Sequence, residues 1–167
     1  WQGTLLGLVI GSTMTRLVRD PLAQALVVGW AFSGFVQGIA GFGVPVAVVA
    51  PLLVLMGFHP AKAAAIVLVG HAWAVALGSL GSSYYTIVLV TGIPGDAIGP
   101  HIAALMALPT VLTGLAVAHL EGGMASVRRG FPAVLIIGGA MASGQWAMAA
   151  VGAPQIAPIA AGLIGCG

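Results

Sequence analysis

Long stretches without a single charged side chain constrain this chain more than any other feature. Of the 167 residues, only 5% are charged and 60% are hydrophobic, whereas about a quarter of the residues in a soluble domain carry a charge. Such a chain cannot cover a water-facing surface, so soluble enzyme folds are excluded and a membrane protein is predicted. The charge-free runs are 1–15, 21–61, 63–95, 97–120 and 130–167.

The lengths of these runs predict an all-α fold, a polytopic transmembrane helical bundle. One crossing of the bilayer takes about 20 apolar residues, so 97–120 fits one crossing and 21–61 holds two arms. Those arms either cross twice or form a broken, re-entrant hairpin, and both interpretations stay open. Residues 1–167 are expected to form one partial transmembrane domain with segments at about 1–15, 21–37, 45–58, 63–81, 97–120, 130–151 and 153–167.

The few charged residues predict how the bundle is oriented. Basic residues occur in three short loops, at Arg16–Arg19, at Lys62 and at Arg128–Arg129. An even number of expected arms separates each loop from the next, so all three lie on one side. The positive-inside rule makes this the cytoplasmic side of a multi-pass plasma-membrane protein. The formal net charge of +2 is too small to indicate a nucleic-acid partner.

A dense group of helix-breaking residues interrupts the apolar run 21–61. Gly38, Gly41, Gly43 and Pro45 fall within eight residues, and glycine and proline lower helix propensity by about 1 and 3 kcal/mol. Irregular backbone at membrane depth is tolerated only where protein buries it or water reaches it. Free N–H groups at a half-helix N-terminus would suit an anion such as a carboxylate. An ordinary tight turn between closely packed helices is the other interpretation.

A second break follows in Gly78–Tyr85, at the end of the expected helix 63–81. Ser79 there supplies a hydroxyl, and His71 lies midway along the expected helix, at a depth where an ionisable residue indicates function. Because free histidine titrates near neutral pH, His71 is a candidate proton carrier. A neutral imidazole bonded to a neighbouring helix is the alternative interpretation.

Nothing in the sequence predicts chemistry on a substrate. The His, Cys, Asp and Glu residues show no metal-ligand spacing, and no nucleophile stands beside a His–carboxylate pair. We therefore expect no metal, no cofactor and no enzyme, which leaves translocation. The chain begins at Trp1 without an initiator Met and stops directly after an apolar run, so we expect an internal part of a longer membrane protein.

The residues around the first break belong to a longer pattern. It reads Gln37, Gly38, Ile39, Ala40, Gly41, Phe42, Gly43, Val44, Pro45, Val46 and Ala47. It continues through Ala50, Pro51, Leu52, Leu53, Val54, Gly57 and Phe58, and then through Val75, Ala76, Leu77, Gly78, Ser79, Leu80 and Gly81. This pattern resembles the L-lactate permease family, whose members carry E-G-A-A-G-F-G-x-P-V-A-I and then an apolar arm. The resemblance covers residues 30–93, and 94–167 resemble the family only in hydropathy.

The resemblance implies a secondary transporter of the cytoplasmic membrane that moves lactate, glycolate or a related hydroxy-monocarboxylate with a proton. It also implies inverted repeats, re-entrant hairpins and, as a partner, the remainder of a longer permease chain. The small carboxylate anion would contact Gln37 and His71 and the backbone N–H groups around Gly41 and Gly43. The expected substrate-binding residues are Gln37, Gly38, Gly41, Phe42, Gly43, Pro45, His71 and Ser79.

Two departures from the family pattern affect the expected coupling. The family's acidic residue corresponds to Gln37, and its Asn–Thr pair corresponds to His71 and Ala72. We therefore predict that His71, rather than a carboxylate, carries the coupling proton. Transport of another organic or inorganic anion, coupling to another cation, and a non-transporting membrane scaffold with glycines for packing remain open.

Overall fold

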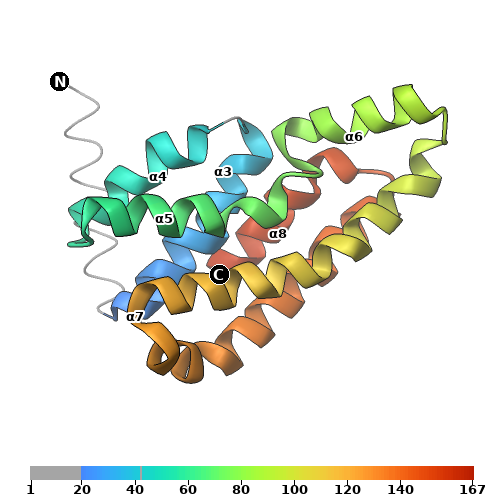
Figure 1. Cartoon of the computed structure of the whole chain (residues 1–167). Helices are drawn as coiled ribbons and strands as arrows, with labels where there is room; N and C mark the ends of the chain where they lie inside the picture. Colours follow the sequence, from blue (N-terminus) through green and yellow to red (C-terminus); the bar gives the residue numbers. More distant parts are fainter. Residues whose placement is uncertain (1–19, 42) are drawn as a thin grey trace.

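The computed structural model of the chain describes residues 20–41 and 43–167, which form a bundle of packed helices (Figure 1). No strand occurs in this described part. In chain order the helices are α2 (Pro21–Gln24), η1 (Ala25–Phe32), α3 (Ser33–Ile39), α4 (Val44–Leu55), α5 (Pro60–Gly70), η2 (Ala72–Ala74), α6 (Gly78–Thr91), α7 (Gly95–Ala150), η3 (Pro154–Ile156) and α8 (Ala157–Cys166).

Two helices are long and apolar enough to cross a membrane, and a bent helix pair makes a third such stretch when it is counted as one span. The first is Pro21–Ile39, a helix of 19 residues in which the π-helix η1 joins α2 to α3. The second is α7, whose 56 residues form two arms because Gly122 and Gly123 leave the helical region (Figure 1). The third is the pair Pro60–Ala74 and Gly78–Thr91, which is bent by 47°. A helical bundle with a broken span confirms the predicted fold class.

The hairpin expected over 21–58 has arms of unequal length. Gly41 (φ +62°) and Gly43 (φ +88°) adopt the left-handed conformation that glycine permits, and α4 begins directly after them. α4 has 12 residues, about 18 Å of helix against about 30 Å of hydrocarbon. It is therefore too short to cross alone. It returns to the end of the molecule where α2 begins, since Met56 and Pro21 line one cavity there.

The predicted continuous helix over 63–81 is wrong. α5 ends at Gly70, and only the short η2 lies between it and α6. Gly70 packs against the backbone of Gly29 so closely that a Cβ would have no room. Further on, Ser79, Leu80 and Gly81 form a left-handed turn with φ of +53°, +52° and +83°. The predicted break exists, but it starts at His71, which lies at the end of a helix rather than in its middle.

Glycines let the two buried tryptophans of the core contact neighbouring helices directly. The ring of Trp73 occupies the place of a Cβ on Gly34, and the ring of Trp30 lies against Gly114 and Gly138. The indole of Trp30 donates to Thr113 Oγ1 at 3.2 Å. These contacts join η2 to α3, and η1 to both arms of α7, so much of the glycine excess serves packing.

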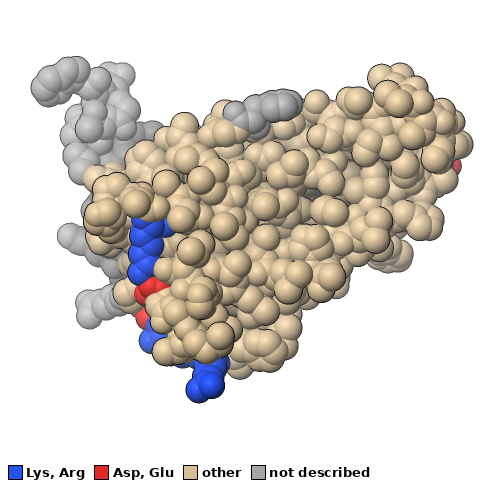
Figure 2. Space-filling model, viewed as in Figure 1, with Lys and Arg blue, Asp and Glu red and all other residues tan. Residues whose placement is uncertain are grey.

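Most charged side chains of the described residues gather at one end of the molecule, and one acidic patch lies at the opposite edge (Figure 2). Arg129 pairs with Asp20 at 3.0 Å, and the ammonium of Lys62 donates to the backbone carbonyl of Glu121. The Lys62 loop and the hairpin of α7 therefore lie at the same end, called the charged end below. The remaining predicted loop, which contains Arg16 and Arg19, lies outside the described residues.

Candidate functional site

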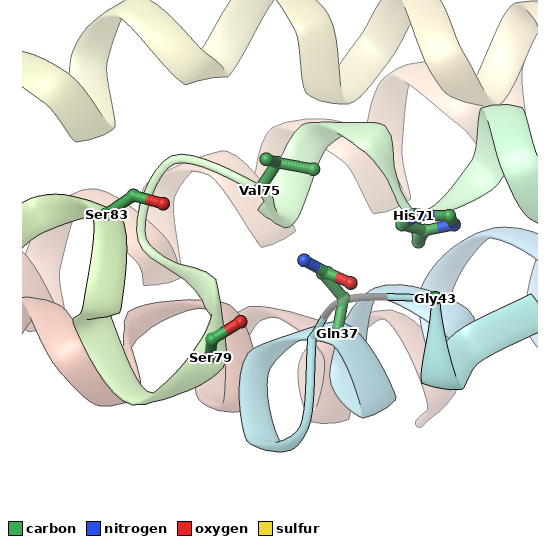
Figure 3. Close-up of a pocket in the computed structure, with 6 residues that line it drawn as sticks. All are labelled: Gln37, Gly43, His71, Val75, Ser79 and Ser83. Atoms are coloured by element: carbon green, nitrogen blue, oxygen red, sulfur yellow. The ribbon is translucent and has the colours of Figure 1, made fainter.

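The break between α3 and α4 and the break between α5 and α6 meet around one cavity. The cavity has a volume of about 230 Å³, room for several waters at about 30 Å³ each or for one small organic anion. Its walls come from α3, the start of α4, the α5–α6 break and the first turn of α6 (Figure 3). The lining residues are Gln37, Gly43, His71, Val75, Ser79 and Ser83. Four of these six residues have polar side chains, and none of the six is Lys, Arg, Asp or Glu; this is called the central cavity below.

Gln37 projects into the cavity between the His71 and Ser79 walls (Figure 3). The residue is only 5% exposed, and its Oε1 has no hydrogen-bond partner within the described part of the chain. Gly78 makes this placement possible, because a Cβ there would lie 3.0 Å from the Gln37 backbone oxygen and 3.4 Å from Nε2. A buried carbonyl oxygen without a partner costs about 1–3 kcal/mol, so Gln37 Oε1 is an unsatisfied acceptor beside the cavity.

His71 faces the same cavity with one ring nitrogen already in use. Its Nδ1 lies 2.6 Å from the carbonyl oxygen of Val67, one helical turn earlier. Because a carbonyl only accepts, Nδ1 carries the proton and Nε2 holds the lone pair of the neutral ring. His71 therefore has a second nitrogen that can take up a proton.

Ser79 and Gly41 hold the two breaks against each other. A Cβ on Gly41 would coincide with the hydroxyl of Ser79, so glycine is required at this crossing point. Ser79 itself has a φ of +53°, which is uncommon for a residue with a side chain. Strained backbone of this kind concentrates at functional sites, and here it brings the serine hydroxyl to the cavity wall.

Three of the N–H groups at the start of α4 are already used within the turn. The Val44 N–H donates to Gly41 O at 3.0 Å, and the N–H groups of Val46 and Ala47 donate to Gly43 O. These donors are satisfied within the turn, while Pro45 has none to give. Side chains, rather than these N–H groups, therefore supply most of the polar contacts available to a ligand.

The expected site residues divide into two groups. Gln37, Gly43, His71 and Ser79 come together at the cavity. By contrast, Gly38 is packed against Ile159 of α8, Gly41 lies beneath Ser79, and Pro45 is buried in the first turn of α4. Phe42 lies outside the described residues.

Two further lining residues, Val75 and Ser83, are absent from the expected set. Ser83 belongs to the small-residue break that begins at Gly78, and its hydroxyl is the signal that could have found it. Val75 carries no comparable signal, because an apolar residue within an apolar stretch does not indicate a binding site.

Comparison with known proteins decides the family. The family model described as L-lactate permease matches residues 7–167, nearly the whole chain. The chain belongs to the L-lactate permease family. This confirms the resemblance and extends it across the second half of the chain, where hydropathy alone had suggested it.

Individual relatives agree with this assignment. The L-lactate permease of Salmonella typhimurium is 31% identical over 156 residues, which cover 93% of this chain and 28% of the relative. The glycolate permease GlcA of Escherichia coli has the same identity and coverage, and the L-lactate permease of Bacillus subtilis is 30% identical over 156 residues. The chain thus spans little more than a quarter of the length of these relatives. No solved structure matches it.

Proposed function

We propose that this member of the L-lactate permease family forms the substrate-binding part of a permease for lactate or a related hydroxy-monocarboxylate. The observation that carries the proposal is the central cavity, where two broken helices bring Gln37, His71 and Ser79 together. Relatives named L-lactate permease and glycolate permease support the substrate class. Broken helices that meet around a polar cavity are typical of secondary transporters.

The chemistry of the lining fits a hydroxy acid better than a simple carboxylic acid. A carboxylate only accepts hydrogen bonds, and Gln37 Nε2 and the serine hydroxyls can donate to it. The unpartnered Gln37 Oε1 needs a donor, which the hydroxyl of lactate or glycolate supplies. The amide of Gln37 would then bind both functional groups of one substrate.

His71 is the proposed site of the coupling proton. With its Nδ1 proton directed at Val67 O, neutral His71 holds a lone pair on Nε2, which repels an anion bound beside it. Protonation at Nε2 turns the same nitrogen into a charged donor. Anion and proton binding therefore favour each other, and this linkage is reciprocal.

Uptake of radiolabelled substrate by the complete permease between pH 5 and 8 tests this coupling. Uptake is expected to fall as pH rises, because fewer coupling protons are available, and His71→Gln should abolish the pH dependence. An unchanged pH profile in His71→Gln would overturn the role of His71.

The proposed orientation puts the charged end on the cytoplasmic side of the plasma membrane. Lys62, Arg128 and Arg129 support it through the positive-inside rule. A single cysteine in place of Arg128, which is exposed, should react with an impermeant thiol reagent only from the cytoplasmic side. Reaction from outside would reverse the orientation.

A screen of radiolabelled anions with the complete permease tests the substrate class. Lactate and glycolate should be taken up and compete with one another, whereas propionate, which lacks the hydroxyl, should compete about tenfold less well for want of one hydrogen bond. Equal competition by propionate would refute recognition of the hydroxyl. Preference for an unrelated anion would refute the substrate class.

Cysteine accessibility separates transport from a purely structural role. Gly43 is exposed on the cavity and has open space where a Cβ would lie. With Cys166 replaced first, Gly43→Cys should react with hydrophilic thiol reagents, and substrate should slow the reaction. A scaffold with no water-accessible cavity would leave it unreactive.

A further inference from the structure

A second cavity lies at the charged end, at the opposite end of α4 and α5 from the central cavity. Its volume is about 260 Å³. Gln24, Met56, His59, Lys62 and Glu121 are among its lining residues. α4 leads from Gly43 to Met56 and α5 from Lys62 to His71, so the same two helices contribute to both cavities. The nine residue steps from Lys62 to His71 correspond to about 14 Å of helix.

Lys62 gives this end cavity its positive charge. Its ammonium donates to the backbone carbonyl of Glu121, and no carboxylate of the described chain lies within ion-pair distance of it. A hydrogen bond from an ammonium to a carboxylate is stronger than one to a neutral carbonyl. An incoming carboxylate can therefore replace the Glu121 carbonyl as the partner of Lys62.

Two further groups at the start of α5 favour an anion. His59 precedes the helix and lines the cavity, and the first turn of an α-helix carries the positive end of the helix dipole. The opposing charge is the Glu121 carboxylate, which accepts a hydrogen bond from Ser126 Oγ at 2.6 Å. That bond ties the carboxylate to the turn of the α7 hairpin rather than to Lys62.

We propose that the end cavity is a second carboxylate-binding site in which the Lys62 ammonium binds the anion. The anion would bind there transiently before it enters, or after it leaves, the central cavity. That the anion is the permease's own hydroxy-monocarboxylate rests on the proposed function. The charge preference of the end cavity does not, because it follows from the Lys62 ammonium and the start of α5, with the Glu121 carboxylate bonded to Ser126.

The test measures charge preference without measuring transport. Met56→Cys is introduced into the full-length permease from which all other cysteines have been removed. Its rates of modification by a sulfonate-bearing and by a trimethylammonium-bearing methanethiosulfonate are then compared. Met56 lines the cavity and is partly buried, and its replacement leaves Lys62 and His59 in place.

Lys62→Gln should lower the ratio of anionic to cationic reagent rates about tenfold, the size of effect expected from one nearby unit charge at a partly buried site. Glu121→Gln should raise the ratio, and Lys62→Arg should keep it. Arg128→Gln is the matched control: this exposed cation lies outside the cavity lining, and solvent screens its charge. L-lactate should slow the anionic reagent when Lys62 is present and have no effect in Lys62→Gln.

A ratio that Lys62→Gln leaves unchanged would overturn the site. The site would also be overturned if Lys62→Arg lowered the ratio as much as Lys62→Gln does. That result would mean that Lys62 serves only to hold α5 against α7. If the ratio responds to Lys62 but L-lactate gives no protection, the end cavity does not bind the proposed substrate. His59→Cys provides a second reporter position if Met56→Cys fails to fold.

Discussion

Replacement of Gly41 by alanine tests how the two breaks are held together. A Cβ at position 41 would coincide with Ser79 Oγ and lie 2.8 Å from Ser79 Cβ. It would also have to adopt a φ of +62°, which costs a residue with a side chain about 1–2 kcal/mol. Overpacking of the contact adds about 1–3 kcal/mol. The expected loss of folding free energy is therefore about 2–5 kcal/mol, with loss of substrate uptake.

Gly43→Ala is the matched control for this prediction. Gly43 has a similar conformation, with φ of +88°, but nothing lies within 4 Å of its Cβ position. It should cost only the conformational term of about 1–2 kcal/mol. The double variant Gly41→Ala with Ser79→Gly should recover most of the loss, because the nearest remaining atom of residue 79 would be Cα at 3.5 Å.

Thermal unfolding of the purified full-length permease, followed together with uptake, measures these effects. The midpoint should fall most for Gly41→Ala, less for Gly43→Ala, and rise again when Ser79→Gly is added to Gly41→Ala. If Gly41→Ala is no more destabilising than Gly43→Ala, or if Ser79→Gly gives no recovery, the proposed contact between the two breaks is refuted.

Two other substitutions test the packing and the charged end. Trp73→Ala should destabilise the permease by about 3–5 kcal/mol, because the fully buried indole fills the space next to Gly34. A loss of less than about 1 kcal/mol in thermal or denaturant unfolding would contradict this packing. Asp20→Asn should change stability by less than about 1 kcal/mol, as expected for a solvent-exposed ion pair. The side chains of Asp20 and Arg129 are 46% and 60% exposed. A larger loss in the same assay would mean that the Asp20–Arg129 pair stabilises the charged end.

Local signals in the sequence were sufficient to predict the membrane bundle and to single out three polar residues that the structure brings together. Scarce charge predicted the membrane bundle, and clustered glycines predicted a break after Gln37. Gln37, His71 and Ser79 stood out because polar side chains are costly in an apolar run. These are local signals, and the structure brings all three residues to one cavity.

The helix end at Gly70 and the packing of Gly38 could not be predicted from the sequence, because both depend on contacts between segments that are distant in the chain. α5 ends at Gly70 on contact with the backbone of Gly29, about forty residues earlier. Gly38 looked like part of the site because it lies in the motif, yet Ile159 of α8 packs on it. Hydropathy and propensity describe each segment alone, so neither reveals which of several glycines faces a cavity and which faces a helix.

The central claim is that the cavity between the two breaks binds the substrate, with Gln37 as its main polar contact. Gln145 provides a matched control: it too is a buried glutamine, fully enclosed, and its Oε1 and Nε2 have no partner in the described residues, but it does not line the central cavity. Methionine has a similar length and no amide, so the same substitution can be made at both positions.

Equilibrium binding of radiolabelled L-lactate to the purified full-length permease tests the claim most directly. Gln37→Met should weaken binding about 10- to 100-fold, the value of a hydrogen bond to a charged ligand. Gln145→Met should leave binding unchanged and raise thermal stability, because it removes a buried amide without partners. Unchanged lactate affinity in Gln37→Met, or an equal loss in both variants, would contradict the assignment of the central cavity as the substrate site.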